Sequence, residues 1–268
     1  MPVLVAIAFI VAIGILVLVL FGQWLTPYSP TAQNLALSST GPNHAHWLGT
    51  DSLGRDVLSL IIAGSRVAVV GPLVIALGCV LFGASLGILA GFKGGVLDAA
   101  INRFADLLFA LPGLVIIIVI VGVIGGGYWF AVFVLMALSV PVEIRLVRSA
   151  ASVVARLPYI EAARTIDISN TRIMFRHVLP NVLPTIIATF LLDLVGALIS
   201  LSSLAYLGLG VPPGTADWGS LLQEGQNLLY TNPWLSIAPG LMIVLTATSL
   251  TLIGDWVYDR YSLRGDQP

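Results

Sequence analysis

Residues 182–207 read VLPTIIATFLLDLVGALISLSSLAYL, and Asp193 is the single charged side chain in this run. A helix rises about 1.5 Å per residue, so about 20 apolar residues cross the hydrocarbon core of a bilayer. The run therefore predicts a membrane-spanning helix. The composition of the whole chain agrees, because 58% of its 268 residues are hydrophobic and only 9% are charged, whereas a soluble domain carries about 25% charged residues.

Long uncharged runs of this kind recur along the chain and predict an all-α, polytopic membrane protein with six transmembrane helices. The predicted spans are Val3–Gly22, Val67–Ala90, Leu107–Ile124, Trp129 to about Arg145, Val182–Leu207 and Leu235–Gly254. The fourth is the shortest, because Glu143 interrupts it, and Tyr128 and Trp129 at its start are typical interface anchors. The first span is followed by Gln23-Trp24-Leu25-Thr26, which offers no small-residue cleavage site, so we expect it to be retained.

We predict a single transmembrane domain over residues 1–268. Residues 1–64 form its first span and an outer loop, and residues from about 65 to 258 form its core. Cationic loops stay in the cytoplasm, which fixes the orientation. With the N-terminus inside, ten of the 12 Lys and Arg residues are cytoplasmic and only Arg55 and Arg66 are outside. Both termini are therefore predicted to be cytoplasmic.

Several classes of site are excluded by composition. The net charge of −1 leaves no basic footprint for nucleic acid. Cys79 is the only cysteine, and His44 and His46 make only two ligands, so we predict no disulfide and no metal site. Lys93 is the only lysine and is followed by Gly94, so the chain has no Walker A loop and no predicted catalytic residue. Energy must come from a partner or from an ion gradient.

The segment between the fourth and fifth spans, residues 148–184, is longer than a turn between two helices requires. Tyr159 to Ile166 reads as one short amphipathic helix. Arg172 to Leu179 reads as a second, which Pro180 and Pro184 are expected to end. We predict that both helices lie at the inner face of the membrane.

Within this segment the chain resembles the permease subunits of ABC importers of the type I fold. Glu161-Ala162-Ala163 matches their EAA motif, and Arg176 to Asn181 matches the end of their loop. The resemblance implies cytoplasmic coupling helices that dock on an ATPase. The coupling residues that it implies are Tyr159, Glu161, Ala162, Ala163, Arg164, Asp167, Arg172 and Arg176. The family usually has glycine where this chain has Asp167, and Asp can adopt a positive φ at a cost of about 1 kcal/mol.

A second resemblance lies after the first span, where residues 46–59 read HWLGTDSLGRDVLS. This stretch, with residues 204–211 and Trp218-Gly219, is similar to the dipeptide, oligopeptide and nickel importers, and within them to the DppC or OppC type of permease. Its signature residues are Gly49, Thr50, Asp51, Gly54, Arg55 and Asp56. Asp51, Arg55 and Asp56 can pair locally to form a compact loop, or they can contact a docked binding protein.

The resemblance implies a non-catalytic subunit of an ATP-driven peptide importer in the cytoplasmic (inner) membrane. Its partners would be membrane lipid, a homologous second permease in a heterodimer, two ATPase subunits that bind ATP and Mg, an extracytoplasmic substrate-binding protein and a peptide substrate. Nickel and glutathione importers of the same family are alternatives.

A different class stays open from the residues alone, which is an ion-coupled secondary transporter centred on Asp193. Asp193 is the candidate for the translocation path, but it could also pair with a partner permease or form an interhelical hydrogen bond. Glu143 with Arg145, and Arg103 with Asp106, are expected to anchor inner span ends.

Overall fold

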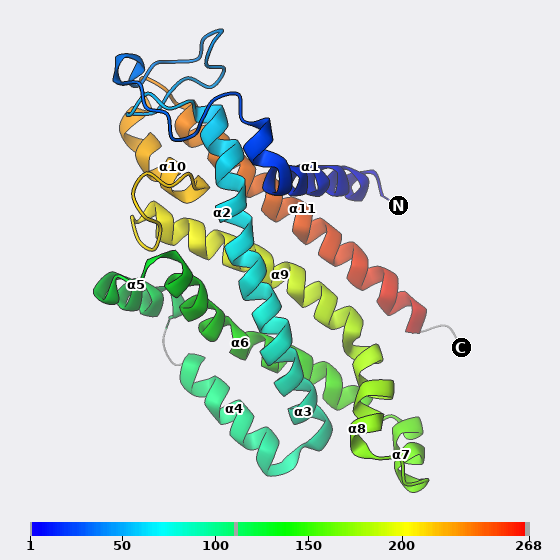
Figure 1. Ribbon diagram of the computed structural model, residues 1–268. Coiled ribbons are helices and arrows are strands. Elements are labelled where there is room, and N and C mark those ends of the chain that lie inside the picture. The colour runs from blue at the N-terminus through cyan, green and yellow to red at the C-terminus, as the bar shows by residue number, and fades with distance from the viewer. Residues whose placement is uncertain (1, 110–111, 266–268) are drawn as a thin grey trace.

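The computed structural model describes residues 2–109 and 112–265, and these residues form an almost entirely helical bundle (Figure 1). The longer helices are α1 (Val3–Leu25), α2 (Val57–Gly78), α3 (Ser85–Lys93), α4 (Gly95–Phe109), α5 (Gly113–Ile124), α6 (Gly127–Val154), α9 (Leu179–Tyr206) and α11 (Trp234–Gly265). The shorter elements are η1 (Leu35–Leu37), the π-helical η2 (Cys79–Ala84), α7 (Pro158–Thr165), α8 (Asn170–Ile173), the π-helical η3 (Met174–Val178), α10 (Trp218–Gly225) and η4 (Gln226–Leu228).

In the described part of the chain, five helices are long and apolar enough to cross a membrane. The pair α4 and α5, bent by 66°, counts as a sixth when the two helices are taken as one broken span. The predicted all-α membrane fold is confirmed, and five to six spans agree with the six predicted. The third predicted span, Leu107–Ile124, is not one straight helix. It includes Ala110 and Leu111, a part of the prediction that lies outside the described residues.

The second and fourth spans are longer than predicted. The second begins at Val57, ten residues earlier than predicted, because the Asp56 carboxylate caps α2 by accepting a hydrogen bond from the Ser59 backbone N–H at 2.8 Å. The fourth is a full-length helix, α6, and Glu143 lies inside it with none of its surface exposed. Counting charges misplaced both ends, because the exposed Arg66 lies inside α2 and the buried Glu143 lies inside α6, and neither ends its helix.

The fifth span extends as one continuous helical stretch from Asn170 to Tyr206. The prediction that Pro180 and Pro184 end a separate short helix is therefore wrong. The π-helical turn η3 lies immediately before Pro180, and its wider turn leaves room where a proline ring would otherwise meet the carbonyl of the preceding turn. The stretch α8–η3–α9 is thus one continuous helix with a π-helical turn inside it.

The second span, α2–η2–α3, lies in close contact with α6, and glycines on its three elements make this approach possible. A Cβ added at Gly78 would lie 2.0 Å from Met136 Sδ, and one at Gly87 would lie 2.8 Å from the Ile144 carbonyl oxygen. Gly83 and Gly91 are crowded by α6 in the same way. Gly78 and Gly83 are five residues apart, and the π-helical η2 between them keeps both on the same face.

The two ends of the bundle carry different structures (Figure 1). We call one the α10 end; it contains residues 26–56, the loop 207–217, α10 and residues 226–233. We call the other the α7 end; it contains α7, α8 and the turn between α3 and α4. At the α10 end, the buried Trp218 indole donates to the Ile61 carbonyl at 3.0 Å, which fixes α10 against α2.

The glycine contact predicts a difference between two Gly→Ala substitutions in helices. Gly87→Ala is expected to destabilise the folded chain by about 1–3 kcal/mol, because its methyl group would overlap α6. Gly14→Ala is the control, because nothing lies within 4 Å of its added Cβ, and alanine there is neutral or stabilising. Thermal unfolding of the detergent-purified protein measures both. Equal midpoints for the two variants would contradict the proposed role of the contact.

Candidate functional site

At the α7 end, α7 forms where the first amphipathic helix was predicted. Pro158 occupies its first turn, where a missing N–H costs nothing. Ile160 and Ala163 are buried against a core that includes Ala151 and Ile173. The predicted coupling residues Tyr159, Glu161, Ala162 and Arg164 lie on the exposed face of α7. The helix therefore has one face fixed to the bundle and one face free.

Asp167 makes the turn that follows α7. Its φ is 59°, so the positive φ predicted for this position is confirmed. The Ile168 N–H donates to the Ala163 carbonyl at 3.2 Å and the Asp167 N–H donates to the Arg164 carbonyl at 3.1 Å, so these bonds satisfy carbonyls at the end of α7. Aspartate tolerates the left-handed conformation that glycine usually provides in such turns.

The exposed surface at this end combines charged and apolar side chains. Arg172 and Arg176 are exposed on the α8–η3 stretch, and Ile166 and Phe175 expose 73% and 65% of their surfaces. Sequence patterns did not single out these two apolar residues. The sequence did contain a sign of an interaction surface here, because an isoleucine beside the Asp167 turn and a phenylalanine beside Arg176 are unusual in a solvated loop.

Most charged side chains at this surface form no ion pair with other described residues of the chain. The Arg164 guanidinium lies over the Phe92 ring at 4.9 Å from its centroid, which fixes α7 to the end of α3. With the side chains that the structure describes, Glu161, Asp167, Arg172 and Arg176 form no ion pair. The α7 end therefore presents charges and apolar groups that a partner protein can pair and cover.

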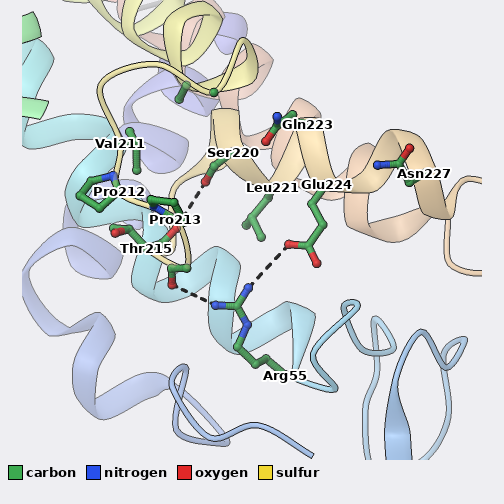
Figure 2. A pocket seen from close by; sticks show the side chains of 13 residues that line it. Arg55, Val211, Pro212, Pro213, Thr215, Ser220, Leu221, Gln223, Glu224 and Asn227 are labelled. Carbon is green, nitrogen blue, oxygen red and sulfur yellow. Dashed lines mark hydrogen bonds and ion pairs between the residues drawn. The ribbon is translucent and has the colours of Figure 1, made fainter. Parts of the chain in front are cut away.

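At the α10 end, Arg55 connects three segments of the chain (Figure 2). Its Nε donates to the buried Asp51 carboxylate at 2.5 Å, and its Nη1 donates to the Gly214 carbonyl at 2.9 Å. Its Nη2 lies 3.6 Å from Glu224 of α10. Local pairing was predicted from the sequence, whereas the contacts with Gly214 and Glu224 bridge about 160 residues of chain.

Gly49 and Gly54 adopt positive φ values of 74° and 72°. A Cβ at Gly54 would lie 1.9 Å from the Asn34 carbonyl oxygen, so only glycine fits there. Thr50 is fully buried, and its hydroxyl donates to the Leu37 carbonyl. These three signature residues hold the loop in one compact conformation.

Asp56 completes the signature by joining α2 to the loop. Its Oδ2 accepts hydrogen bonds from the backbone N–H and hydroxyl of Ser59, and its Oδ1 lies 2.9 Å from His46 Nδ1. His46 is thus paired with a capping carboxylate. Among the described residues, no group of three His, Cys, Asp or Glu side chains could hold a metal ion.

A cavity of about 460 Å³ lies beside Arg55, between the loop 207–217 and α10 (Figure 2). Polar side chains of α10 and η4, Gln223, Glu224 and Asn227, line one wall, and Pro212 and Pro213 line another. Asp217 begins α10 and accepts from the Gly219 and Ser220 backbone N–H groups. Burial raises the pKa of its carboxyl, while these N–H groups act in the opposite direction.

Inside the bundle, Asp193 lies on α9 and its Oδ2 is buried without a hydrogen-bond partner among the described atoms. Glu143 does not anchor a span end as expected, because it lies inside α6 and its Oε1 lies 3.0 Å from the Thr189 hydroxyl. The acids and bases near the α7 end pair between helices. Asp106 of α4 pairs with Arg145 of α6 at 2.5 Å, and Asp98 pairs with Arg148.

This geometry defines a polytopic helical membrane protein with an elaborate loop structure at one end and a short amphipathic helix at the other. The chain belongs to the family of binding-protein-dependent transport system inner membrane components, which matches residues 83–264. It is therefore a multi-pass inner-membrane permease of the ABC importer type, a class that works with ATPase and binding-protein partners. This membership favours the predicted importer over an ion-coupled carrier.

Curated relatives cover nearly the whole chain. A glutathione transport system permease, GsiD, of Pectobacterium atrosepticum is 37% identical over 93% of this chain and 85% of its own length. A probable D,D-dipeptide transport system permease, DdpC, of Escherichia coli is 33% identical over 93% and 84%. The dipeptide transport system permease DppC of Haemophilus influenzae is 34% identical over 90% and 83%. The predicted resemblance to DppC-type permeases is confirmed.

A solved structure shows the same fold. An inward-facing form of the methionine ABC transporter MetNI aligns with a TM-score of 0.59 at 17% identity, over 75% of this chain and 96% of that chain. At this identity the likeness concerns the fold alone, and it confirms the type I permease architecture.

The Arg55 network predicts a large effect of removing its charge. Arg55→Leu leaves the buried Asp51 carboxylate unpaired and is expected to destabilise the α10 end by about 3–5 kcal/mol. Arg66→Leu, which changes an exposed cation at the same end, is the control with an expected effect within about 0.5 kcal/mol. Thermal unfolding and limited proteolysis of residues 26–56 measure both. Wild-type protease resistance in Arg55→Leu would show that the pair is dispensable.

Proposed function

We propose that this chain is the non-catalytic permease subunit of an importer for di- or oligopeptides and that it couples transport to separate ATPase subunits at its α7 end. The observation that carries the proposal is α7, whose buried Ile160 and Ala163 fix it to the bundle while Glu161 and its neighbours stay exposed. A partner that moves this surface moves the bundle with it. ATP and Mg belong to the ATPases in this proposal.

The proposed orientation places both termini and the α7 end in the cytoplasm. The cations predicted to be cytoplasmic include Arg148, Arg156, Arg164 and Arg176, which lie at or near the α7 end, whereas Arg55 and Arg66 lie at the α10 end. This asymmetry supports the orientation. The α10 end then faces the extracytoplasmic binding protein.

The coupling surface consists of Tyr159, Glu161, Ala162, Ala163, Arg164, Asp167, Arg172 and Arg176 in this proposal. Ala163 acts from the buried side by allowing α7 to approach the core closely, and the other residues are exposed. Exposed Ile166 and Phe175 extend the surface with apolar area that an ATPase groove can cover. The continuous stretch α8–η3–α9 leads from this surface into the membrane, so movement at α8 is transmitted as a rigid-body shift.

The chain works in this proposal as one unit, residues 1–268, with the coupling loop 148–184 as its moving part. It pairs with a homologous permease in a heterodimer and serves two ATPase subunits. Exposed apolar side chains on α5, among them Val119 and Val123, offer a surface for the second permease or for lipid. Asp193 is proposed to lie beside the translocation path.

Peptide is the proposed substrate because two of the three relatives described above are named as dipeptide permeases. Glutathione is the second candidate, because the relative with 37% identity is named for it. Both molecules carry peptide bonds and charged ends, so the same path chemistry suits both. Nickel chelates remain a further alternative within the wider branch.

The coupling proposal predicts that Glu161→Lys weakens association with the ATPase subunits about tenfold or more. A reversed charge on the exposed face of α7 costs on the order of 1–3 kcal/mol at a complementary interface. Asp259→Lys is the control, because it reverses an exposed acid on α11, outside the proposed surface. Co-purification and transport-coupled ATP hydrolysis in liposomes measure both. Normal coupling in Glu161→Lys would reject this surface.

The substrate proposal predicts that the assembled transporter with its binding protein takes up labelled dipeptide. Unlabelled dipeptide should compete for this uptake, and glutathione should compete weakly. Uptake assays in proteoliposomes with ATP inside and binding protein outside measure this. Strong competition by glutathione together with no dipeptide uptake would reassign the substrate without affecting the coupling proposal.

A further inference from the structure

Glu143 is an acid inside the membrane that the proposed function does not use. It lies in the interior of α6 with none of its surface exposed. Its Oε1 lies 3.0 Å from the Thr189 hydroxyl of α9, and its Oε2 is buried with no hydrogen-bond partner among the described atoms. A buried carboxyl group with one oxygen unpartnered requires an explanation.

A second carboxyl group lies next to it. Thr189 and Asp193 are four residues apart on α9, so they share one face of that helix. The Asp193 Oδ2 is also buried without a partner in the described structure. Thr189 contacts Glu143, and a Cβ at Gly83 of η2, one turn from Cys79, would lie 2.7 Å from the Glu143 Cβ. Glu143, Asp193 and Cys79 therefore lie in one region of the bundle, which we call the Glu143–Asp193 cluster.

The helices packed around Glu143 bring neutral and acidic groups against it. From η2, a Cβ at Gly83 would lie 2.7 Å from the Glu143 Cβ, and Cys79 is one turn away. From α9 come Thr189 and Asp193. The nearest cations along α6 are engaged elsewhere, since Arg145 and Arg148 pair with Asp106 and Asp98 of α4.

Two ionised carboxylates in such a place are costly, since a charge removed from water needs a partner and like charges repel. A proton is small enough to neutralise one of them without a cavity. Intramembrane acids of this kind usually mark a functional site.

We propose that Glu143 binds a proton in the assembled transporter, so that the Glu143–Asp193 cluster carries at most one negative charge between α6 and α9. The hydrogen bonds suit a protonated Glu143. Thr189 Oγ1 lies 3.0 Å from Glu143 Oε1 and 3.0 Å from the Thr185 carbonyl, but a hydroxyl has only one proton to donate. A protonated Glu143 donates to Thr189 Oγ1, and Thr189 then donates to the Thr185 carbonyl.

The proton has a consequence for coupling. Loss of the proton places two like charges between α6 and α9. Helix α9 belongs to the continuous stretch α8–η3–α9, which begins at the α7 end. Packing of α6 against α9 weakens when the proton leaves. Stability and transport-coupled ATP hydrolysis therefore fall as the pH rises through the ionisation of Glu143, and a neutral glutamine at this position removes that part of the fall.

The experiment uses the complete transporter in liposomes, with Glu143→Gln, Asp193→Asn and the exposed control Asp259→Asn. Infrared spectroscopy measures the C=O stretch of protonated carboxyl groups at neutral pH. We expect Glu143→Gln to lose one such band and Asp259→Asn to lose none. Thr189→Val should shift the same band, because it removes the proposed acceptor. ATP hydrolysis of Glu143→Gln should depend less on alkaline pH than that of the wild type.

Each alternative gives a distinct result. An unchanged carboxyl band in Glu143→Gln overturns the proposal, and loss of the band only in Asp193→Asn assigns the proton to Asp193 instead. Activity that varies with sodium or potassium at fixed pH, with no carboxyl band, assigns the site to a metal cation. If Glu143→Gln does not assemble, the wild-type band and its shift in Thr189→Val decide the question.

Discussion

Close approach of the α2–η2–α3 helix to α6 is the constraint on which the rest of the structure depends. Lipid offers apolar side chains no gain from burial against each other, so membrane helices associate through tight packing at small residues. Gly78, Gly83 and Gly87 supply this packing, and the π-helical η2 keeps them on one face despite an irregular spacing. The contact also brings Glu143 beside η2, which creates the buried acidic cluster.

The two ends of the bundle differ in where their charged side chains lie. At the α10 end, Asp51 and Arg55 neutralise each other and tie the signature loop to α10 and to the loop 207–217. At the α7 end, the buried face of α7 is apolar and the charges remain exposed. A loop that is rigid by itself suits a fixed docking platform, whereas exposed charges suit a contact that a partner completes. The continuous helical stretch α8–η3–α9 connects the α7 end to the membrane interior.

Sequence reasoning predicted the number of spans, the position of α7 and the positive φ at Asp167, because each depends on local composition or on one residue's backbone preference. It misplaced the start of the second span, the end of the fourth and the break at Pro180. Those errors have one cause: charged residues and prolines were taken as helix boundaries. Arg66 lies inside α2, which Asp56 caps, and η3 accommodates Pro180. Glu143 is buried by η2 and α9, which are distant from it in sequence, so no local pattern reveals that burial.

The sequence by itself determined that this chain is a helical membrane protein without a Walker A loop and with an EAA segment, because hydropathy and short motifs are properties of contiguous residues. Tertiary structure alone decided that Arg55 reaches Gly214 and Glu224, that Asp106 pairs with Arg145, and that Glu143 meets Thr189 beside Asp193. Such contacts join residues 39 to about 170 positions apart. They depend on which faces of the helices pack together, and that choice follows from the shape of the whole bundle.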